Sequence, residues 1–222
     1  MGDMVTLTAK DGVKIKAYRA TPNGKPRGGI VVLQEIFGVN RHVRKVADEF
    51  ALAGYLVIAP ALFDRVAPDV ELGYGPDDIK RGIDIRGKTK FEDTLADIEA
   101  AVAAATEAGA VGIVGYCWGG TLAYAAATHL QGIAAAVCYY GSGIANMRRE
   151  TLMAPTQFHF GERDKSIPPA DIEKIREAHP DSAFYIYPAD HGFSCSERPS
   201  FDAQSAELAQ SRTLEFFAHY LG

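Results

Sequence analysis

Short apolar runs and amphipathic stretches alternate along most of this chain, and the alternation limits the folds open to it. Continuous apolar runs such as Gly29–Leu33 are typical of strands buried on both faces of a parallel sheet. Between the runs, as in residues 43–50, apolar side chains recur with the spacing of one helix face. Alternating strands and helices predict an α/β fold with a mainly parallel sheet and helices on both faces. The length of 222 residues suits one core, so we expect a single domain over residues 1–222.

The other predicted elements follow the same two patterns. Two short runs, residues 5–7 and 13–18, flank Lys10-Asp11-Gly12 and predict an antiparallel hairpin at one edge of the sheet. Further strands are predicted at residues 29–33, 56–59, 111–114, 133–139, 156–160 and 184–187, and helices at residues 43–50, 95–102, 119–130, 170–178 and 206–221. Residues 60–89 fit neither pattern, and we interpret them as a lid or a substrate loop.

One pentapeptide stands where a predicted strand ends and a predicted helix begins: Gly115-Tyr116-Cys117-Trp118-Gly119. In this G-x-nucleophile-x-G pattern, a sharp turn projects the middle side chain above the sheet, and the glycines allow close backbone approach. The helix N-terminus stabilises a thiolate, and the N–H after the nucleophile can hold an oxyanion. A cysteine at a buried strand end is more often an inert core residue, so the pentapeptide alone leaves both interpretations open.

Two further residues favour the catalytic interpretation of Cys117. In α/β-hydrolases the chain order is nucleophile, acid, histidine. Asp164 follows the predicted strand at residues 156–160, and His191 follows the one at residues 184–187. Since the carboxyl ends of parallel strands share one sheet edge, all three side chains are expected there. The sequence therefore predicts an α/β-hydrolase fold with a Cys117, His191, Asp164 triad.

Other acids and histidines were weighed against this triad. Asp190 and Asp181 are alternatives to Asp164 as the acid, but Asp190 adjoins His191 and is badly placed to orient its ring. Asp164 itself could be only a loop or capping residue. The remaining histidines are interpreted as surface or packing residues: His42, His129, His159, His179 and His219.

Four segments together point to one family: Gln34-Glu35-Ile36-Phe37-Gly38, the cysteine pentapeptide, Gly161-Glu162-Arg163-Asp164 and His191-Gly192-Phe193. In these segments the chain resembles the dienelactone hydrolase family, and the resemblance extends over nearly its whole length. It implies hydrolysis of an enol-lactone of the carboxymethylenebutenolide type through an acyl-enzyme on Cys117.

The resemblance also implies roles for individual residues. His191 would act first as base and then as acid, held by Asp164. The N–H groups of Ile36 and Trp118 would form the oxyanion hole. Glu35 would contact the resting thiol and help to generate the thiolate when substrate binds. As a charge, Glu35 raises the pKa of a neighbouring thiol, so it could hold the nucleophile in reserve. The alternative for Glu35 is an ion pair or cap at a strand end.

Family substrates carry a carboxylate, so the resemblance implies a cationic clamp, for which Arg81, Arg86 and Arg198 are candidates. Known members have an arginine shortly after the catalytic histidine, in H-S-F-A-R. Here that place holds Cys195, and Arg198 comes later, where it could belong to a structural Arg-Pro turn. A carboxylesterase or thioesterase of small acyl substrates therefore remains an alternative, as does a non-catalytic binding protein on a hydrolase scaffold.

Charge and residue spacing argue against several other classes of protein. With 23 basic and 28 acidic residues, the net charge of −5 gives no reason to expect a nucleic-acid partner. No paired His or Cys spacing suits a metal, and no glycine-rich motif suits a nucleotide, so neither metal nor cofactor is expected. The partner we expect is a small-molecule lactone or ester.

The predicted location is the cytoplasm. The first ten residues lack the basic and apolar regions of a signal peptide. Residues 108–147 carry no Asp, Glu, Lys or Arg, but glycines interrupt them too often for a membrane span, so no membrane partner is expected. Three widely spaced cysteines suit a reducing compartment. A monomer or small homo-oligomer is expected.

Overall fold

A single eight-stranded sheet forms the centre of the computed structural model, which describes residues 2–222. Its strand order is β1-β2-β4-β3-β5-β6-β7-β8. From β4 to β8 all neighbours are parallel, whereas β2 is antiparallel to both β1 and β4. The strands are β1 Asp3–Thr8, β2 Lys14–Ala20, β3 Gly29–Leu33, β4 Leu56–Pro60, β5 Val111–Tyr116, β6 Ile133–Tyr139, β7 Thr156–Gly161 and β8 Ala183–Tyr187. The predicted fold class, with an antiparallel hairpin at one edge, is confirmed.

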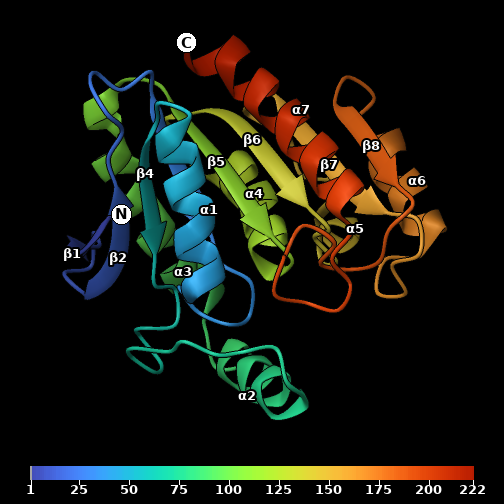
Figure 1. Ribbon diagram of the computed structural model, residues 1–222, viewed down its shortest axis with the longest axis horizontal. Coiled ribbons are helices and arrows are strands. Elements are labelled where there is room, and N and C mark those ends of the chain that lie inside the picture. Colours follow the sequence, from blue (N-terminus) through green and yellow to red (C-terminus); the bar gives the residue numbers. More distant parts are fainter. Residues whose placement is uncertain (1) are drawn as a thin grey trace.

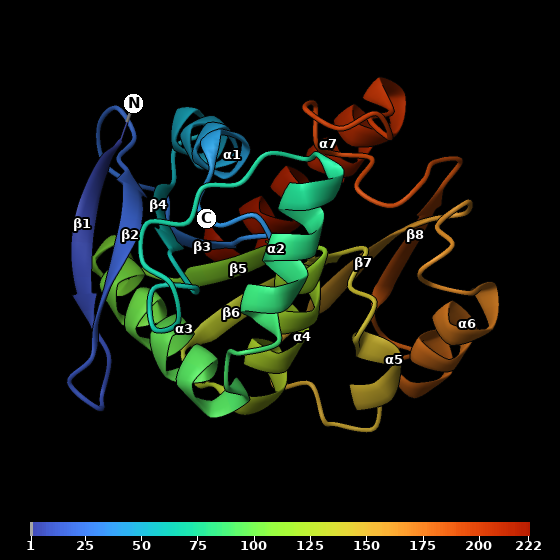
Figure 2. The same ribbon diagram turned by 90° about the horizontal axis from the view of Figure 1, so that it is seen from below.

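Helices cover both faces of this sheet. In Figure 1, α1 and α7 cross the near face, and in Figure 2 they lie on the side opposite α3 and α4. Because helices cover both faces, the central strands β3, β4 and β5 are buried along their whole length and form the middle of the core. The helices are α1 Arg41–Leu52, α2 Pro76–Arg86, α3 Phe91–Ala105, α4 Trp118–His129, α5 Ile144–Met147, α6 Pro169–Ala178 and α7 Ala203–Leu221.

Residues 60–89 differ from the sequence prediction because they contain a regular helix, α2. Pro76 lies in its first turn with Asp77 and Asp78, which are favourable signals for a helix start. Only Gly82 and Ile85 are buried along the helix, so the periodic apolar signal was too weak to find it. Short α5 and a 3₁₀ turn at residues 106–108 also escaped prediction.

Helix α2 lies across the carboxyl ends of the central strands (Figures 1 and 2). A Cβ on Gly82 would overlap the carbonyl oxygen of Ile36, so this glycine is what allows α2 to approach the end of β3 so closely. A second apolar cluster anchors the segment: Ile36, Phe37, Phe63, Val70, Leu72 and Ile85. Action as a lid or substrate loop stays a prediction.

Two other sequence predictions concern the chain as a whole. Within residues 2–222, none of the helices combines the length and apolar character needed to cross a bilayer. The organisation as one domain over residues 1–222 stays a prediction.

Candidate active site

Cys117 occupies the sharp turn between β5 and α4. Its φ of 57° and ψ of −115° lie in a region that side chains other than glycine rarely adopt. The backbone is held there by a hydrogen bond in which Cys117 N donates to Tyr139 O at 3.0 Å, and by Thr121 N donating to Cys117 O at 3.2 Å. The residue is half-buried, whereas the other two cysteines, Cys138 and Cys195, are buried.

The two glycines of the pentapeptide are explained by contacts of the backbone. A Cβ on Gly115 would overlap the carbonyl oxygen of Gly119, and a Cβ on Gly119 would overlap that of Leu33. The turn therefore requires glycine at both positions, as the motif suggested.

Asp164 and His191 come together at the same edge of the sheet. Asp164 follows β7, His191 follows β8, and His191 Nδ1 lies 2.6 Å from Asp164 Oδ2. The Asp164 side chain is fully buried, whereas 21% of the His191 side chain is exposed. A buried acid that orients the ring and leaves its other nitrogen accessible is the arrangement of a catalytic dyad.

Electrostatics favour an ionised form of this pair. Burial alone lowers the pKa of His191, but interactions with the Asp164 carboxylate and with Cys117 outweigh it and raise the pKa from 6.5 to about 10. Burial raises the pKa of Asp164, but the hydrogen bonds from His191 and Ser166 hold it below its usual 3.8. At neutral pH, imidazolium and carboxylate therefore face each other.

Ser166 is a member of this cluster that the sequence analysis missed. Its N and Oγ both donate to Asp164 Oδ1, at 2.8 and 2.5 Å, and its Oγ lies 3.1 Å from His191 Nδ1. Both oxygens of Asp164 are thus paired. The Asp-x-Ser sequence was the available signal, because an aspartate often accepts a hydrogen bond from the backbone two residues on.

Trp118 and Ile36 supply the two backbone N–H groups considered for an oxyanion hole. Trp118 is the first residue of α4, and Ile36 follows β3, which pairs with β5. Within residues 2–222, neither N–H donates to a protein acceptor. The indole of Trp118 is fixed by stacking on Phe63, with ring centroids 5.2 Å apart. Both N–H groups are therefore available to a ligand oxygen.

Glu35 is buried at the end of β3 and pairs with Arg198. The side chain of Glu35 is only 1% exposed, and Arg198 Nη1 donates to its Oε1 at 3.0 Å. Burial raises the pKa of Glu35, and the positive charges of Arg198 and His191 oppose that rise. The sequence analysis left an ion pair as the alternative for Glu35. The ion pair exists, while contact with the resting thiol stays a prediction.

Of the arginines considered as carboxylate clamps, Arg198 is the one that pairs with Glu35. Its guanidinium stands 5.8 Å from the Phe37 ring centroid and 6.0 Å from that of Tyr74. Gly192, with φ of +77°, leaves room for it, because a Cβ there would overlap the guanidinium. Arg81 is exposed on α2, and Arg86 lines a cavity of about 530 Å³ that also touches Trp118.

The remaining candidates lie in other surroundings. Asp190 is 53% exposed and sits 3.7 Å from Arg163, so it does not orient His191. His159 is a core residue, with Nδ1 2.8 Å from Tyr187 Oη and Nε2 2.8 Å from Gln157 Oε1.

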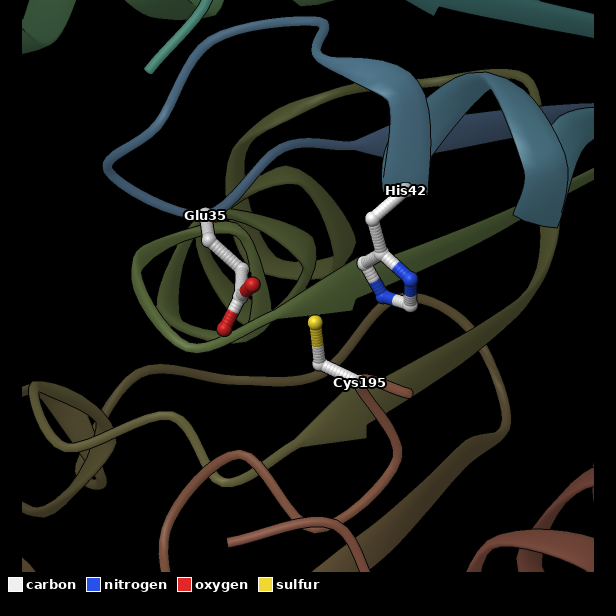
Figure 3. A group of neighbouring side chains, drawn as sticks. All are labelled: Glu35, His42 and Cys195. Carbon is white, nitrogen blue, oxygen red and sulfur yellow. The ribbon is translucent and has the colours of Figure 1, made fainter. Parts of the chain in front are cut away.

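His42 and Cys195, which the sequence analysis did not connect with the site, lie beside Glu35 (Figure 3). Burial, assisted by the charges of Lys45 and Arg198, lowers the pKa of His42 to about 4, so its ring is neutral. Burial and the neighbouring Glu35 raise the pKa of Cys195 to about 11. These three side chains form what we call the buried cluster: Glu35, His42 and Cys195.

The parallel sheet, the nucleophile turn and the order of residues at the strand ends define an α/β-hydrolase. A model of the dienelactone hydrolase family matches residues 15–221. The chain therefore belongs to the dienelactone hydrolase family, and it is a hydrolase of small-molecule esters.

Known proteins resemble the chain over almost its full length. A Synechocystis sp. protein provisionally named a carboxymethylenebutenolidase is 36% identical over 235 residues, covering 96% of this chain and 95% of its own. A Pseudomonas sp. carboxymethylenebutenolidase is 34% identical over 225 residues, covering 95% and 92%. A crystal structure of a provisionally named dienelactone hydrolase from Klebsiella pneumoniae has a TM-score of 0.87 and 30% identity, covering 99% and 100%.

Proposed function

We propose that this enzyme opens a carboxymethylenebutenolide-type enol-lactone through a thioester on Cys117, with His191 and Asp164 completing the triad. The observation that carries this proposal is the 2.6 Å contact between His191 Nδ1 and Asp164 Oδ2 beside the strained turn at Cys117. The names of the relatives in Synechocystis and Pseudomonas support the choice of lactone.

In the first half of the reaction, Cys117 attacks as the thiolate, with its proton held by His191, and Sγ forms the C–S bond with the lactone carbonyl carbon. The carbonyl oxygen becomes an oxyanion, which the N–H groups of Ile36 and Trp118 stabilise by hydrogen bonds. Collapse of the tetrahedral intermediate breaks the ring C–O bond. The proton held by His191 passes to the leaving enolate oxygen, and the ring-opened thioester remains on the enzyme.

In the second half, His191 removes a proton from water, which attacks the thioester carbonyl. The C–S bond breaks, the carboxylic acid leaves, and the proton restores the resting Cys117–His191 pair. Asp164 keeps Nδ1 of the ring engaged in both halves and stabilises the imidazolium.

Intact-protein mass spectrometry tests this route. A carboxylated dienelactone is mixed with wild-type enzyme and quenched in acid at millisecond times. We expect the wild type to gain the mass of one substrate as a thioester. The Cys117→Ser variant should form no thioester. Cys138→Ser, in buried strand β6, is the matched thiol control and should keep the adduct. Turnover that survives Cys117→Ala, or an adduct on another residue, would refute the proposal.

One observation favours uncharged ester substrates as the second candidate function. The charge of Arg198 is already balanced by Glu35 at 3.0 Å, and Arg81 is exposed on α2. Comparing kcat/KM for a carboxylated dienelactone with that for p-nitrophenyl acetate and butyrate separates the two candidates. A preference for the uncharged esters would reject the lactone assignment while leaving the triad intact.

The proposed setting is the cytoplasm, without nucleic-acid or membrane partners and without a cofactor, as a monomer or small homo-oligomer. The net charge of −5 and three free cysteines support this setting. Light scattering during size-exclusion chromatography would determine the number of chains per particle.

A further inference from the structure

The buried cluster brings together three metal-binding side chains from distant parts of the sequence. Glu35 follows β3, His42 lies in the first turn of α1, and Cys195 lies in the loop between β8 and α7. One carboxylate oxygen, one imidazole nitrogen and the thiol sulfur all lie within 4.8 Å of one another. Figure 3 shows the three side chains extending toward a common space.

Several atoms of this cluster lack a partner although they are buried. Glu35, His42 and Cys195 are 1%, 3% and 0% exposed. Within residues 2–222, Glu35 Oε2 and both ring nitrogens of His42 have no hydrogen-bond partner. Buried polar groups are nearly always paired, so unpaired atoms on two neighbouring side chains, with one ring nitrogen of His42 near the Glu35 carboxylate, indicate that a ligand completes them.

One side of the cluster borders a cavity. His42 lines a cavity of about 180 Å³ whose wall also includes Ser194 and Ser196, the two neighbours of Cys195. Lys45 and Glu49 lie at the same cavity, so its lining carries both charge signs. This cavity borders the cluster on a side whose lining does not include Asp164 or His191.

We propose that Glu35, His42 and Cys195 bind a thiophilic divalent cation of the Zn²⁺ type. The donor set of carboxylate, imidazole and thiolate is one that Zn²⁺ accepts, with bonds of about 2.0–2.3 Å. Around a tetrahedral ion, such bonds place donor atoms roughly 3.3–3.8 Å apart, so the cluster closes by modest side-chain rotation. Water from the cavity supplies the fourth ligand. On binding, the Cys195 S–H bond breaks, the Zn–S bond forms, and the proton leaves to solvent.

Cation binding would regulate the hydrolase by occupying Glu35. With Oε2 bound to the metal and Oε1 paired with Arg198, neither oxygen of this carboxylate is free to turn toward Cys117 or a substrate. The expected result is inhibition by low concentrations of Zn²⁺. This regulatory consequence rests on the proposed function, whereas the binding site itself does not.

Cobalt absorption provides a test that is independent of catalysis. Co²⁺ replaces Zn²⁺ in such sites, and a cysteine ligand adds a charge-transfer band in the near ultraviolet. The titration uses the full chain carrying Cys117→Ser, so that the nucleophile cannot supply the sulfur. We expect one Co²⁺ per chain with a thiolate band that one equivalent of Zn²⁺ removes.

Added substitutions identify the ligands. In the Cys117→Ser background, Cys195→Ser should abolish the band, and His42→Leu should weaken binding by about 100-fold or more. Cys138→Ser is the matched control and should leave the titration unchanged, since Cys138 is buried in β6. Circular dichroism of each variant confirms folding. A folded Cys117→Ser protein without a band, or a band that survives Cys195→Ser, would overturn the proposal.

Inhibition is then measured separately with the Cys117 nucleophile in place. Zn²⁺ should inhibit the wild type, and the His42→Leu variant should need about 100-fold more Zn²⁺ for the same effect. Equal inhibition of both proteins would overturn regulation through this site, because the metal would then act elsewhere. The hydrolytic mechanism would be unaffected by that outcome, since no step of it uses His42.

Discussion

Two polar clusters lie at the carboxyl edge of the same sheet and differ in how completely they are paired. In the cluster of Asp164, Ser166 and His191, both carboxylate oxygens and the imidazole Nδ1 have partners at 2.5–3.1 Å. In the buried cluster of Glu35, His42 and Cys195, one carboxylate oxygen and two ring nitrogens have none within residues 2–222.

The difference separates two ways of using buried polar groups. A fully paired cluster has one favourable geometry, which suits a reaction that needs its groups positioned in advance. An unpaired buried group costs about 1–3 kcal/mol, so it is expected where a ligand or a change of state restores the lost interactions. Substitutions in each cluster test this contrast.

The largest effect is expected from breaking the paired cluster with Asp164→Asn. The amide cannot stabilise the imidazolium, so kcat/KM should fall by about 10³–10⁴-fold in steady-state assays. The matched control is Asp190→Asn, next to His191 but exposed and in a weak pair with Arg163, which should change activity little. Similar losses in both variants would mean that Asp164 has no special role.

The same variant should alter how stability depends on pH. The pKa of His191 is raised from 6.5 to about 10 in the folded protein. A raised pKa stabilises the fold fully below pH 6.5, and the stabilisation is lost as the pH rises through about 10. The wild-type advantage in melting temperature over Asp164→Asn should therefore shrink between these values in calorimetry. A constant advantage would contradict the ionised pair.

A large loss of stability is expected from Arg198→Met, which leaves the Glu35 charge buried and unpaired. The free energy of unfolding should fall by about 3–5 kcal/mol in urea denaturation. Adding Glu35→Gln to Arg198→Met should recover most of the loss. Arg41→Met is the control, because its pair with Glu197 at 3.0 Å is exposed and should contribute about 1 kcal/mol or less. Equal losses of stability for the two arginine variants would contradict a larger contribution from the buried ion pair than from the exposed one.

Glu35→Gln tests whether the carboxylate controls the nucleophile. If Glu35 holds the nucleophile in reserve, iodoacetamide should alkylate the resting Glu35→Gln variant faster than the wild type. Turnover should nevertheless fall by about 100-fold, because a proton acceptor is lost. Alkylation and turnover that both match the wild type would exclude this role.

The smallest effect is expected from His42→Leu in the metal-free protein. Its ring nitrogens have no hydrogen bonds to lose within residues 2–222, so the free energy of unfolding should change by about 1 kcal/mol or less. His159→Leu is the matched core substitution, and it breaks bonds to Gln157 and Tyr187. It should cost about 1–3 kcal/mol for each group left unpaired. Equal costs would show that His42 has partners after all.

The features predicted correctly from the sequence were those with local causes. The strand at Gly29–Leu33 matched because a continuous apolar run is specific for a buried strand. The turn at Cys117 could be placed because it requires glycines at fixed positions. A Cβ on either glycine would overlap the backbone of the turn or of the adjacent strand. Asp164 and His191 were placed at one sheet edge because parallel strands align their carboxyl ends.

The features missed from the sequence depend on tertiary contacts. Helix α2 has only two buried residues, Gly82 and Ile85, so its sequence shows too weak a repeat of apolar residues at helical spacing to predict it. The buried cluster joins positions up to 160 residues apart, from Glu35 to Cys195, and no spacing rule covers such a set. Arg198 stood three residues beyond the expected position, and its partner Glu35 became apparent only in the folded chain.

The backbone at Cys117 has a consequence for how such an enzyme can evolve. A residue with a side chain held at φ 57° and ψ −115° costs roughly 1–3 kcal/mol, which glycine would largely relieve. The substitution that most relaxes this turn is therefore the one that deletes the proposed nucleophile. Selection for heat resistance alone would tend to discard catalysis, so libraries screened for stability need activity as a second criterion at this position.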